Sequence, residues 1–224
     1  MPPPQSADLK KLLPAQVETI LSTQAPAKEP FMPDVERAAM VSMHPKRRSE
    51  FMHGRICARE ALAALGLPEQ TIPVGANREP VWPADVIGSI SHCGSVAAAV
   101  TARGEYLGGL GIDLELAEPL DSEVLRLICL PFEQTWLEQT DDPLQFAKLI
   151  FSAKESIFKC IWPTLRHFVD FQDIGICIDI NAGTFAPVQW ANNLPATVIR
   201  SITGRYLLQD GWILTTACMP SLET

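Results

Sequence analysis

Gly111-Ile112-Asp113-Leu114-Glu115 alternates apolar and acidic side chains near the middle of the chain. The alternation follows an apolar run and predicts a β-strand, in which residues two apart face the same side. Asp113 and Glu115 are then neighbours, about 6.5 Å apart along the strand. Two carboxylates at this spacing repel each other unless a cation lies between them, and a hard divalent ion such as Mg²⁺ takes oxygen ligands. The alternative is a solvated strand face with two charges, and this pattern leaves both interpretations open.

The length and composition of the chain limit the class of protein. A chain of 224 residues can bury one or two hydrophobic cores. The net charge of −8 argues against a nucleic-acid binder, because such proteins must neutralise phosphates. The six cysteines show no CxxC pair or zinc-ligand spacing, which is typical of reduced, buried thiols in a cytosolic protein. No apolar run is long enough for a signal peptide or a membrane span, so we expect a soluble cytoplasmic protein.

Residues 45–65 are the first strong helix signal, with proline in the first turn and glycine after the end. Arg48, Arg55 and Arg59 are spaced by seven and four, so they share one face of this helix. Positions 41–60 hold five Lys/Arg and two Glu, a local charge of five minus two, or +3. The face is either solvated or a binding site for an anion such as phosphate, which the arginine fork fits. A basic patch on an acidic protein favours the anion site.

The next segments predict antiparallel strands. Residues 86–92 are apolar and end in a polar cluster, Ser91 and His92. A histidine at the end of a strand is either structural or, beside a serine, a phosphate contact. Residues 96–101 and 106–115 flank Arg103-Gly104, which predicts a hairpin whose second strand carries the paired acids.

The second half of the chain repeats the order of helix and then strands. Residues 122–139 are amphipathic and predict a helix interrupted by Pro131. Isoleucines alternate along residues 174–180, and Asp210-Gly211 is a strong hairpin signal between two apolar runs. The chain therefore predicts an α+β fold of two similar halves, each a helix packed on an antiparallel sheet. We place the boundary between residues 1–112 and 113–224.

A second strong helix covers residues 151–159. Ser152 and Glu155 have the S-x-x-E spacing of a capping box, although the helix can instead begin earlier, near Pro143. Glu155 and Lys159 form an i,i+4 pair in the favourable order. Local structure alone can explain these residues. It does not explain a third acid that joins Asp113 and Glu115.

Three blocks in this order resemble the 4′-phosphopantetheinyl transferases of the surfactin-synthetase type: GSISHC at 88–93, GIDLE at 111–115 and FSAKESIFK at 151–159. FSAKES, the loop that contains Arg78 and Trp82-Pro83, and the segment 168–171 are most similar to the enterobactin-synthetase component D branch. The resemblance covers about residues 45–180. Each block is weak by itself, and the three together are highly specific.

The resemblance implies a pseudo-dimeric α/β fold with the active site in the cleft between the halves. The implied reaction transfers 4′-phosphopantetheine from coenzyme A to a serine of an apo carrier protein and leaves adenosine 3′,5′-bisphosphate. It uses Mg²⁺, or Mn²⁺ in its place. The carriers are domains of nonribosomal peptide, polyketide or fatty acid synthases, and the enterobactin-like features suggest siderophore synthesis. We expect a monomer, because two halves of one chain supply one cleft, with no nucleic-acid partner.

The resemblance also implies the site residues. The metal-binding acids are Asp113, Glu115 and Glu155. The coenzyme A contacts are basic or polar, namely Arg48, Arg55, Arg59, Arg78, Ser91, His92, Lys154 and Lys159. The residues assigned to catalysis are Glu155 and, ranked lower, Glu133 as the base, with Lys159 and His92. Arg78 is included because many members have lysine directly before the loop proline, where this chain has Glu79.

Two other functions use the same residues. A Mg²⁺-dependent phosphohydrolase would direct the acids at water, and a non-catalytic member would only bind coenzyme A or a carrier. All three acids and Lys159 are intact, which argues against loss of catalysis. The chain has no Ser-His-Asp arrangement of its own, as expected when the nucleophile belongs to the substrate.

Overall fold

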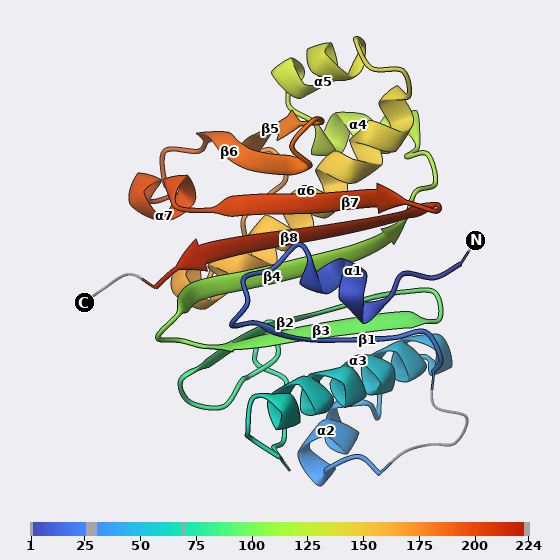
Figure 1. Cartoon of the computed structure of the whole chain (residues 1–224), viewed down its shortest axis with the longest axis vertical. Helices are drawn as coiled ribbons and strands as arrows, with labels where there is room; N and C mark the ends of the chain where they lie inside the picture. The colour runs from blue at the N-terminus through green and yellow to red at the C-terminus, as the bar shows by residue number, and fades with distance from the viewer. Residues whose placement is uncertain (1, 26–30, 69, 222–224) are drawn as a thin grey trace.

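The structure is a computed structural model that describes residues 2–25, 31–68 and 70–221. Two antiparallel sheets lie one above the other, and each carries one long helix (Figure 1). The sheet of the N-terminal half has the strand order β1-β3-β2, and the sheet of the C-terminal half has the order β4-β8-β7-β6-β5. The chain is therefore an α+β protein with two halves of related design, as predicted, although the second sheet has two more strands than the first.

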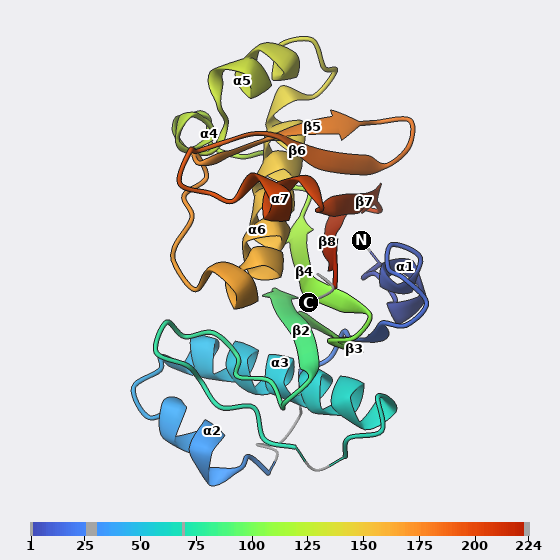
Figure 2. The same cartoon turned by 90° about the vertical axis from the view of Figure 1, so that its left-hand side faces the viewer.

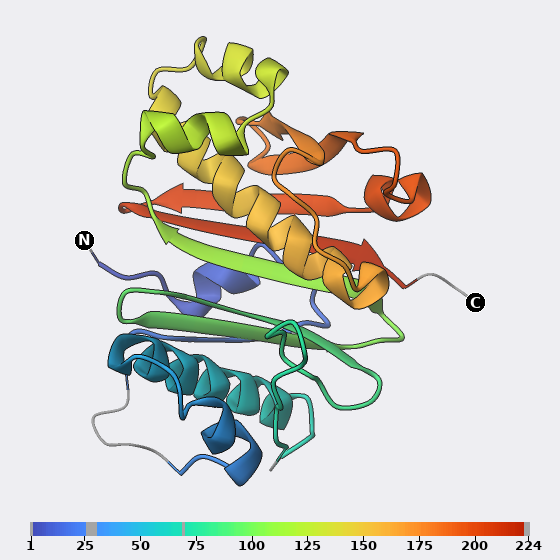
Figure 3. The ribbon, with the colours of Figure 1, turned by 180° about the vertical axis from the view of Figure 1, so that it is seen from behind.

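The elements of the N-terminal half are α1 (Ser6–Lys10), β1 (Glu18–Ser22), α2 (Asp34–Ala39), α3 (Pro45–Ala64), β2 (Val86–Cys93) and β3 (Val96–Arg103). Those of the C-terminal half are β4 (Leu107–Leu116), α4 (Ser122–Ile128), α5 (Pro131–Leu137), α6 (Pro143–Leu165), β5 (Ile174–Asp179), β6 (Thr184–Trp190), α7 (Ala196–Arg200), β7 (Thr203–Gln209) and β8 (Trp212–Pro220). Helix α3 packs on the sheet of the first half and α6 on that of the second (Figure 3).

Most of the predicted elements are confirmed. Helix α3 begins at Pro45 as expected, and the predicted helix at residues 122–139 is interrupted, with α4 ending at Ile128 and α5 beginning at Pro131. Helix α6 begins at Pro143, so Ser152 lies in its interior and is not an N-cap. The β7–β8 hairpin turns at Asp210-Gly211, where both residues have positive φ, which asparagine, aspartate and glycine tolerate best.

The hairpin predicted at Arg103-Gly104 is wrong. Strand β3 pairs with β2 and β1, whereas β4 pairs along its length with β8, about a hundred residues later in the chain. Local turn chemistry cannot distinguish a hairpin from a crossing between two sheets, because both need only a short connection. The strand that carries the acids is thus an outer strand of the C-terminal sheet.

Glycines of β4 bring α6 unusually close to this strand. A Cβ atom at Gly109 would lie 2.4 Å from the carbonyl oxygen of Cys160, and one at Gly111 would lie 1.8 Å from that of Ser156. Both distances are far below van der Waals contact, so any side chain at these positions would force the helix away. The close approach places residues 155 and 159 of α6 beside Asp113 of β4.

The hydrophobic core continues across both halves. Helix α6 buries its apolar face between the C-terminal sheet and the α4–α5 region. A second cluster joins α1 to β3, β4 and β8, and includes Leu9, Leu110 and Leu114. Helix α1 lies on the opposite side of β4 from α6 (Figures 1 and 3). Asp113 and Glu115 point to the same side of β4 as Gly109 and Gly111, which is the side that α6 covers.

Two composition-based predictions can be compared with the fold. All six cysteines are free, and four are buried as expected, while Cys93 is half-buried and Cys177 is exposed. No helix in the described ranges combines the length and the apolarity that a bilayer crossing needs. The division at residues 112 and 113 stays a prediction.

Candidate functional site

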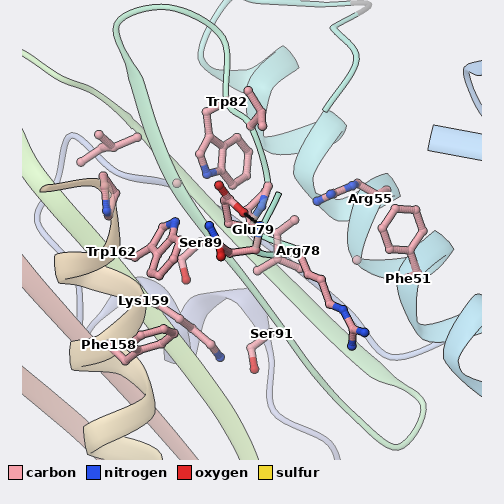
Figure 4. A pocket seen from close by; sticks show the side chains of 18 of the residues that line it. Phe51, Arg55, Arg78, Glu79, Trp82, Ser89, Ser91, Phe158, Lys159 and Trp162 are labelled. Atoms are coloured by element: carbon pink, nitrogen blue, oxygen red, sulfur yellow. Dashed lines mark hydrogen bonds between the residues drawn. The ribbon is translucent and has the colours of Figure 1, made fainter. Parts of the chain in front are cut away.

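One cavity of about 900 Å³ lies between the two halves, within the size range of ligand sites. Its walls come from α3, the loop at residues 76–83, β2, the end of β4, and the C-terminal part of α6. Figure 4 shows Phe158, Lys159 and Trp162 of α6 on one side of this cavity and Arg55 of α3 on the other. Elements far apart in the sequence therefore share one site.

Asp113 and Glu115 both line the cavity, as the strand alternation predicts. Oδ1 of Asp113 accepts hydrogen bonds from Nζ of Lys159 at 2.7 Å and from Oγ of Ser91 at 3.0 Å. Oε2 of Glu115 lies 2.7 Å from Nζ of Lys148. Each acid is thus neutralised by a lysine of α6, and burial raises the pKa of Glu115 while the hydrogen bond from Lys148 opposes the shift.

Glu155 is not among the residues that line the cavity. Burial raises its pKa, Lys159 lowers it, and the negative charges of Asp113 and Glu115 raise it again. The three carboxylates are thus close enough to interact. They are not arranged as a metal centre, because no group of three potential ligands in the described part of the chain has the geometry for one. The prediction that they converge on one cation stays a prediction.

The residues nevertheless fit a hard divalent ion. Oδ2 of Asp113 is buried and has no hydrogen-bond partner, an uncommon state for a carboxylate oxygen. The available donors are all carboxylate oxygens, which Mg²⁺ and Mn²⁺ prefer to nitrogen or sulfur. The ammonium groups of Lys148 and Lys159 now neutralise the charge that such an ion would neutralise.

Arg55 is the arginine of the predicted basic face that lines the cavity. Its guanidinium lies 4.7 Å from the ring centroid of Phe51, and Nη2 donates one long bond of 3.4 Å to the carbonyl of Pro73. Nε is buried without a partner. Burial lowers the pKa of Arg55 to about 10, an effect opposed by Glu36. A buried cation with unused donors is well suited to bind an anion.

The other two arginines of the predicted face lie elsewhere. Arg59 forms an ion pair of 2.5 Å with the fully buried Glu36, which also accepts from the amide of Ile72. Neither Arg48 nor Arg59 lines the cavity. The face of α3 that lines it instead has the i, i+3, i+4, i+7, i+8 pattern and consists of Arg47, Glu50, Phe51, Gly54 and Arg55. The prediction missed Arg47, which a helical wheel centred on Phe51 would have found.

His92 lies in this polar part of the cavity. Nη1 of Arg47 donates to Nε2 of His92 at 2.5 Å, and Oε2 of Glu50 lies 3.8 Å from the same nitrogen. Burial lowers the pKa of His92, and Glu50 opposes the shift. The imidazole therefore connects β2 to α3, and its position is compatible with the predicted phosphate contact.

Glu133 and Lys154 are not in the cavity. Oε2 of Glu133 accepts from Nζ of Lys154 at 2.8 Å, and Oε1 accepts from the amide of Ile176 at 2.8 Å. Nζ of Lys154 also donates to the carbonyls of Ile128 and Phe171. Both side chains are almost fully buried. This geometry argues against the catalytic role predicted for Glu133 and the coenzyme A contact predicted for Lys154, because their hydrogen bonds connect α4, α5, α6, β5 and the segment at Phe171 to one another.

The loop at residues 75–80 carries Arg78 and Glu79 into the cavity lining. Arg78 has a φ of 69°, in the left-handed region. Glu79 organises the loop, since its Oε2 accepts from the amide of Asn77 at 2.9 Å, and Oε1 lies 3.9 Å from Nη1 of Arg166. Two residues that the prediction missed, Lys148 and Arg166, are thus partners of cavity acids. Lys148 is seven residues before Glu155, on the same face of α6.

Comparison with known proteins agrees with this arrangement. Residues 35–102 match the 4′-phosphopantetheinyl transferase N-terminal domain, and residues 109–216 match the 4′-phosphopantetheinyl transferase superfamily. The chain is 36% identical over 217 residues to 4′-phosphopantetheinyl transferase Npt of Nocardia iowensis, covering 92% of this chain and 97% of Npt.

Two further proteins are similar over shorter regions. Enterobactin synthase component D of Escherichia coli (strain K12) is 40% identical over 134 residues, or 58% of this chain and 62% of that protein. Among solved structures, the holo-ACP-synthase from Plasmodium yoelii matches 52% of this chain and 97% of its own length, with 17% identity and a TM-score of 0.41. The chain belongs to the 4′-phosphopantetheinyl transferase superfamily, in the branch that includes enterobactin synthase component D, and it is a transferase of this type.

Proposed function

We propose that the cavity between the halves binds coenzyme A and Mg²⁺ and transfers 4′-phosphopantetheine to a serine of an apo carrier protein. The serine oxygen forms a bond to the β-phosphorus of coenzyme A, and the bond from that phosphorus to the bridging oxygen breaks. The bridging oxygen leaves with adenosine 3′,5′-bisphosphate. The serine proton passes to a base, for which Glu155 is the candidate, because burial raises its pKa and its carboxylate has no hydrogen-bond partner among the described residues.

The single observation that carries this proposal is that acidic and basic side chains line the same cavity. Asp113 and Glu115 line the cavity, and so do the basic side chains of Arg47, Arg55, Arg78 and Lys159. Attack on a pyrophosphate needs alignment and neutralisation of charge more than covalent catalysis. The basic side chains would hold the phosphates in place, while the acids would hold the metal. A bound Mg²⁺ would stabilise the negative charge that develops on the leaving oxygen.

We propose Asp113, Glu115 and Glu155 as the metal ligands. For them to bind the ion, the ammonium groups of Lys148 and Lys159 must leave their present positions on Glu115 and Asp113. Lys159 lies at the cavity wall, so a released ammonium group is placed to contact a phosphate. The same lysine thus neutralises Asp113 in the free protein and would neutralise coenzyme A in the complex.

The decisive experiment is transfer to a panel of apo carrier proteins followed by intact-mass spectrometry. With coenzyme A and Mg²⁺, we expect at least one carrier to gain the mass of one 4′-phosphopantetheine group and an equal amount of adenosine 3′,5′-bisphosphate to form. Addition of EDTA should stop the reaction, and excess Mg²⁺ or Mn²⁺ should restore it. Breakdown of coenzyme A with no carrier labelled would instead support a phosphohydrolase, and binding without reaction would support a non-catalytic protein.

Replacement of Arg55 by alanine should weaken coenzyme A binding by about 10- to 100-fold, the value of one or two hydrogen bonds to a charged group. The reason is that Arg55 has donors without partners and faces the cavity. Isothermal titration calorimetry with coenzyme A in the absence of carrier measures this dissociation constant. An unchanged constant would contradict the phosphate contact.

Arg59→Ala is the matched control, because Arg59 is one turn further along α3 and pairs with Glu36 outside the cavity. We expect it to lower stability and to change the dissociation constant by less than about threefold. An equal loss of binding in Arg59→Ala and Arg55→Ala would contradict this assignment. It would support the anion site of three arginines that the sequence predicts.

The enterobactin-like relatives support a carrier domain of siderophore or other nonribosomal peptide synthesis as the substrate. We further propose that the protein acts as a monomer, because one chain supplies both walls of the cavity. Its six free cysteines are compatible with a cytoplasmic location, where thiols stay reduced.

A further inference from the structure

The two halves meet where β2 and β4 lie side by side (Figure 2). Each strand is at the edge of its own sheet, and among the described strands no backbone ladder joins β2 to β4. Edge strands have amide and carbonyl groups that need partners when they are buried. The contact between the halves must therefore satisfy the backbone of β4 in another way.

Two serine side chains of β2 accept hydrogen bonds from backbone amides of β4. Oγ of Ser89 accepts from the amide of Ile112 at 3.0 Å, and Oγ of Ser91 accepts from the amide of Leu114 at 3.2 Å. Residues two apart in a strand point to the same side, so the spacing of the two hydroxyls matches the spacing of the two amides. Both serines are buried. The hydroxyls thus replace the carbonyl groups of an ordinary ladder.

Only one of these serines also contacts a candidate metal ligand. The hydroxyl of Ser91 donates to Oδ1 of Asp113 at 3.0 Å, and Nζ of Lys159 donates to the same oxygen. The other oxygen of Asp113, Oδ2, is left buried without a partner. Ser89 forms no hydrogen bond with a carboxylate among the described residues, and its hydroxyl only accepts from the amide of Ile112. The two serines therefore have the same role toward the backbone and different roles toward the site.

We propose that Ser91 is a positioning residue for the transfer reaction, holding Asp113 through Oδ1 so that Oδ2 remains available to a divalent cation. Ser89 only maintains the position of β4 against β2. This inference rests on the proposed function of the site. It replaces the phosphate contact predicted for Ser91, because the single hydroxyl proton of Ser91 is already donated to Asp113.

The test uses pairs of variants that differ by one hydroxyl. Threonine keeps the hydroxyl and valine replaces it with a methyl group, and both β-branched side chains suit a strand. We would compare Ser91→Thr with Ser91→Val, and Ser89→Thr with Ser89→Val. The measurements are Mn²⁺ affinity by electron paramagnetic resonance, with coenzyme A present and no carrier, the melting temperature, and steady-state kinetics of transfer.

Both valine variants should melt about 2–8 °C lower than the wild type, because each leaves a buried amide without an acceptor. Only Ser91→Val should also weaken Mn²⁺ binding, by about 10- to 100-fold, the usual effect of losing a group that orients a metal ligand. It should lower kcat with little change in KM for coenzyme A. Ser91→Thr should restore Mn²⁺ affinity to within about threefold of the wild type.

Equal Mn²⁺ affinity in Ser91→Val and Ser91→Thr would overturn the inference, as would an equal loss in Ser89→Val. If Ser91→Val does not fold, Ser91→Ala, which removes only the hydroxyl oxygen, replaces it in the comparison with Ser91→Thr and is judged by the same criterion. Failure of the proposed function is a separate result, because it would appear as absent Mn²⁺ binding or absent transfer in the wild-type protein itself.

Discussion

Asp113→Asn should reduce kcat/KM for Mg²⁺-dependent transfer by about a thousandfold, equivalent to about 4 kcal/mol of transition-state stabilisation. Asparagine keeps the shape of the side chain and an oxygen that can accept from Ser91 and Lys159, but it removes the negative charge. A neutral amide is a poor ligand for Mg²⁺, so charge on the leaving oxygen would be stabilised less. Steady-state transfer to an apo carrier, measured over a range of Mg²⁺ concentrations, checks this result.

Glu118→Gln is the matched control, because Glu118 is an exposed acid shortly after β4 and lies outside the cavity. This variant removes the same charge from the protein. It should leave kcat/KM within about twofold of the wild type, because salt largely screens an exposed charge outside the cavity. A rate for Asp113→Asn within tenfold of the wild type at saturating Mg²⁺ would contradict the metal site. Melting curves confirm that both variants fold.

Lys154→Met should have the largest effect on stability, about 3–5 kcal/mol, because it leaves Glu133 buried without its cation. Burial lowers the pKa of Lys154, and the attraction of Glu133 raises it, so the pair depends on both members. Methionine has a similar length and fills the same apolar surroundings. The decrease in the free energy of unfolding therefore comes mainly from the broken ion pair and not from an empty cavity. Urea denaturation measures the change in the free energy of unfolding.

The double variant Lys154→Met/Glu133→Gln should regain part of this loss, because it removes the buried charge and the single oxygen of glutamine can still accept a hydrogen bond from one of the two amides, that of Leu130 or that of Ile176. Lys11→Met is the surface control: Lys11 pairs with Asp8 but is 71% exposed, so we expect a change below about 1 kcal/mol. If Glu133 were the catalytic base, folded Glu133→Gln would lose nearly all activity. We expect it to retain most of its activity and to lose stability instead.

The main elements of the fold follow from local patterns. The proline and glycine signals placed α3 and the β7–β8 hairpin correctly, and the alternation of residues 111–115 placed two acids on one side of β4. These features depend on backbone preferences and on which side chains avoid water, and both act over a few residues. The partner of β4 could not be predicted in this way, because β8 lies about a hundred residues away in the chain.

Some of the predicted site residues line the cavity, and others lie elsewhere in the fold. Asp113, Glu115, Arg55, Arg78, His92 and Lys159 line one cavity, and Glu155 does not. The roles that the family resemblance implies for them stay predictions. Arg59 and Lys154 were assigned to coenzyme A, and in the structure each pairs with a buried acid, Glu36 and Glu133 respectively. A basic residue on a helix can bind a ligand or neutralise a buried acid of its own protein, and sequence spacing is the same in both cases.

The amino-acid sequence by itself determined which residue types are present, the period of each segment and hence the helices, strands and turns, and it was sufficient to identify the family. The tertiary structure alone decided which charges meet. Gly109 and Gly111 admit α6 against β4, and Ser89 and Ser91 join β2 to β4 in place of a backbone ladder. The physical reason is that electrostatic and hydrogen-bond energies depend on distances in space, which packing sets and which separation along the chain does not reveal.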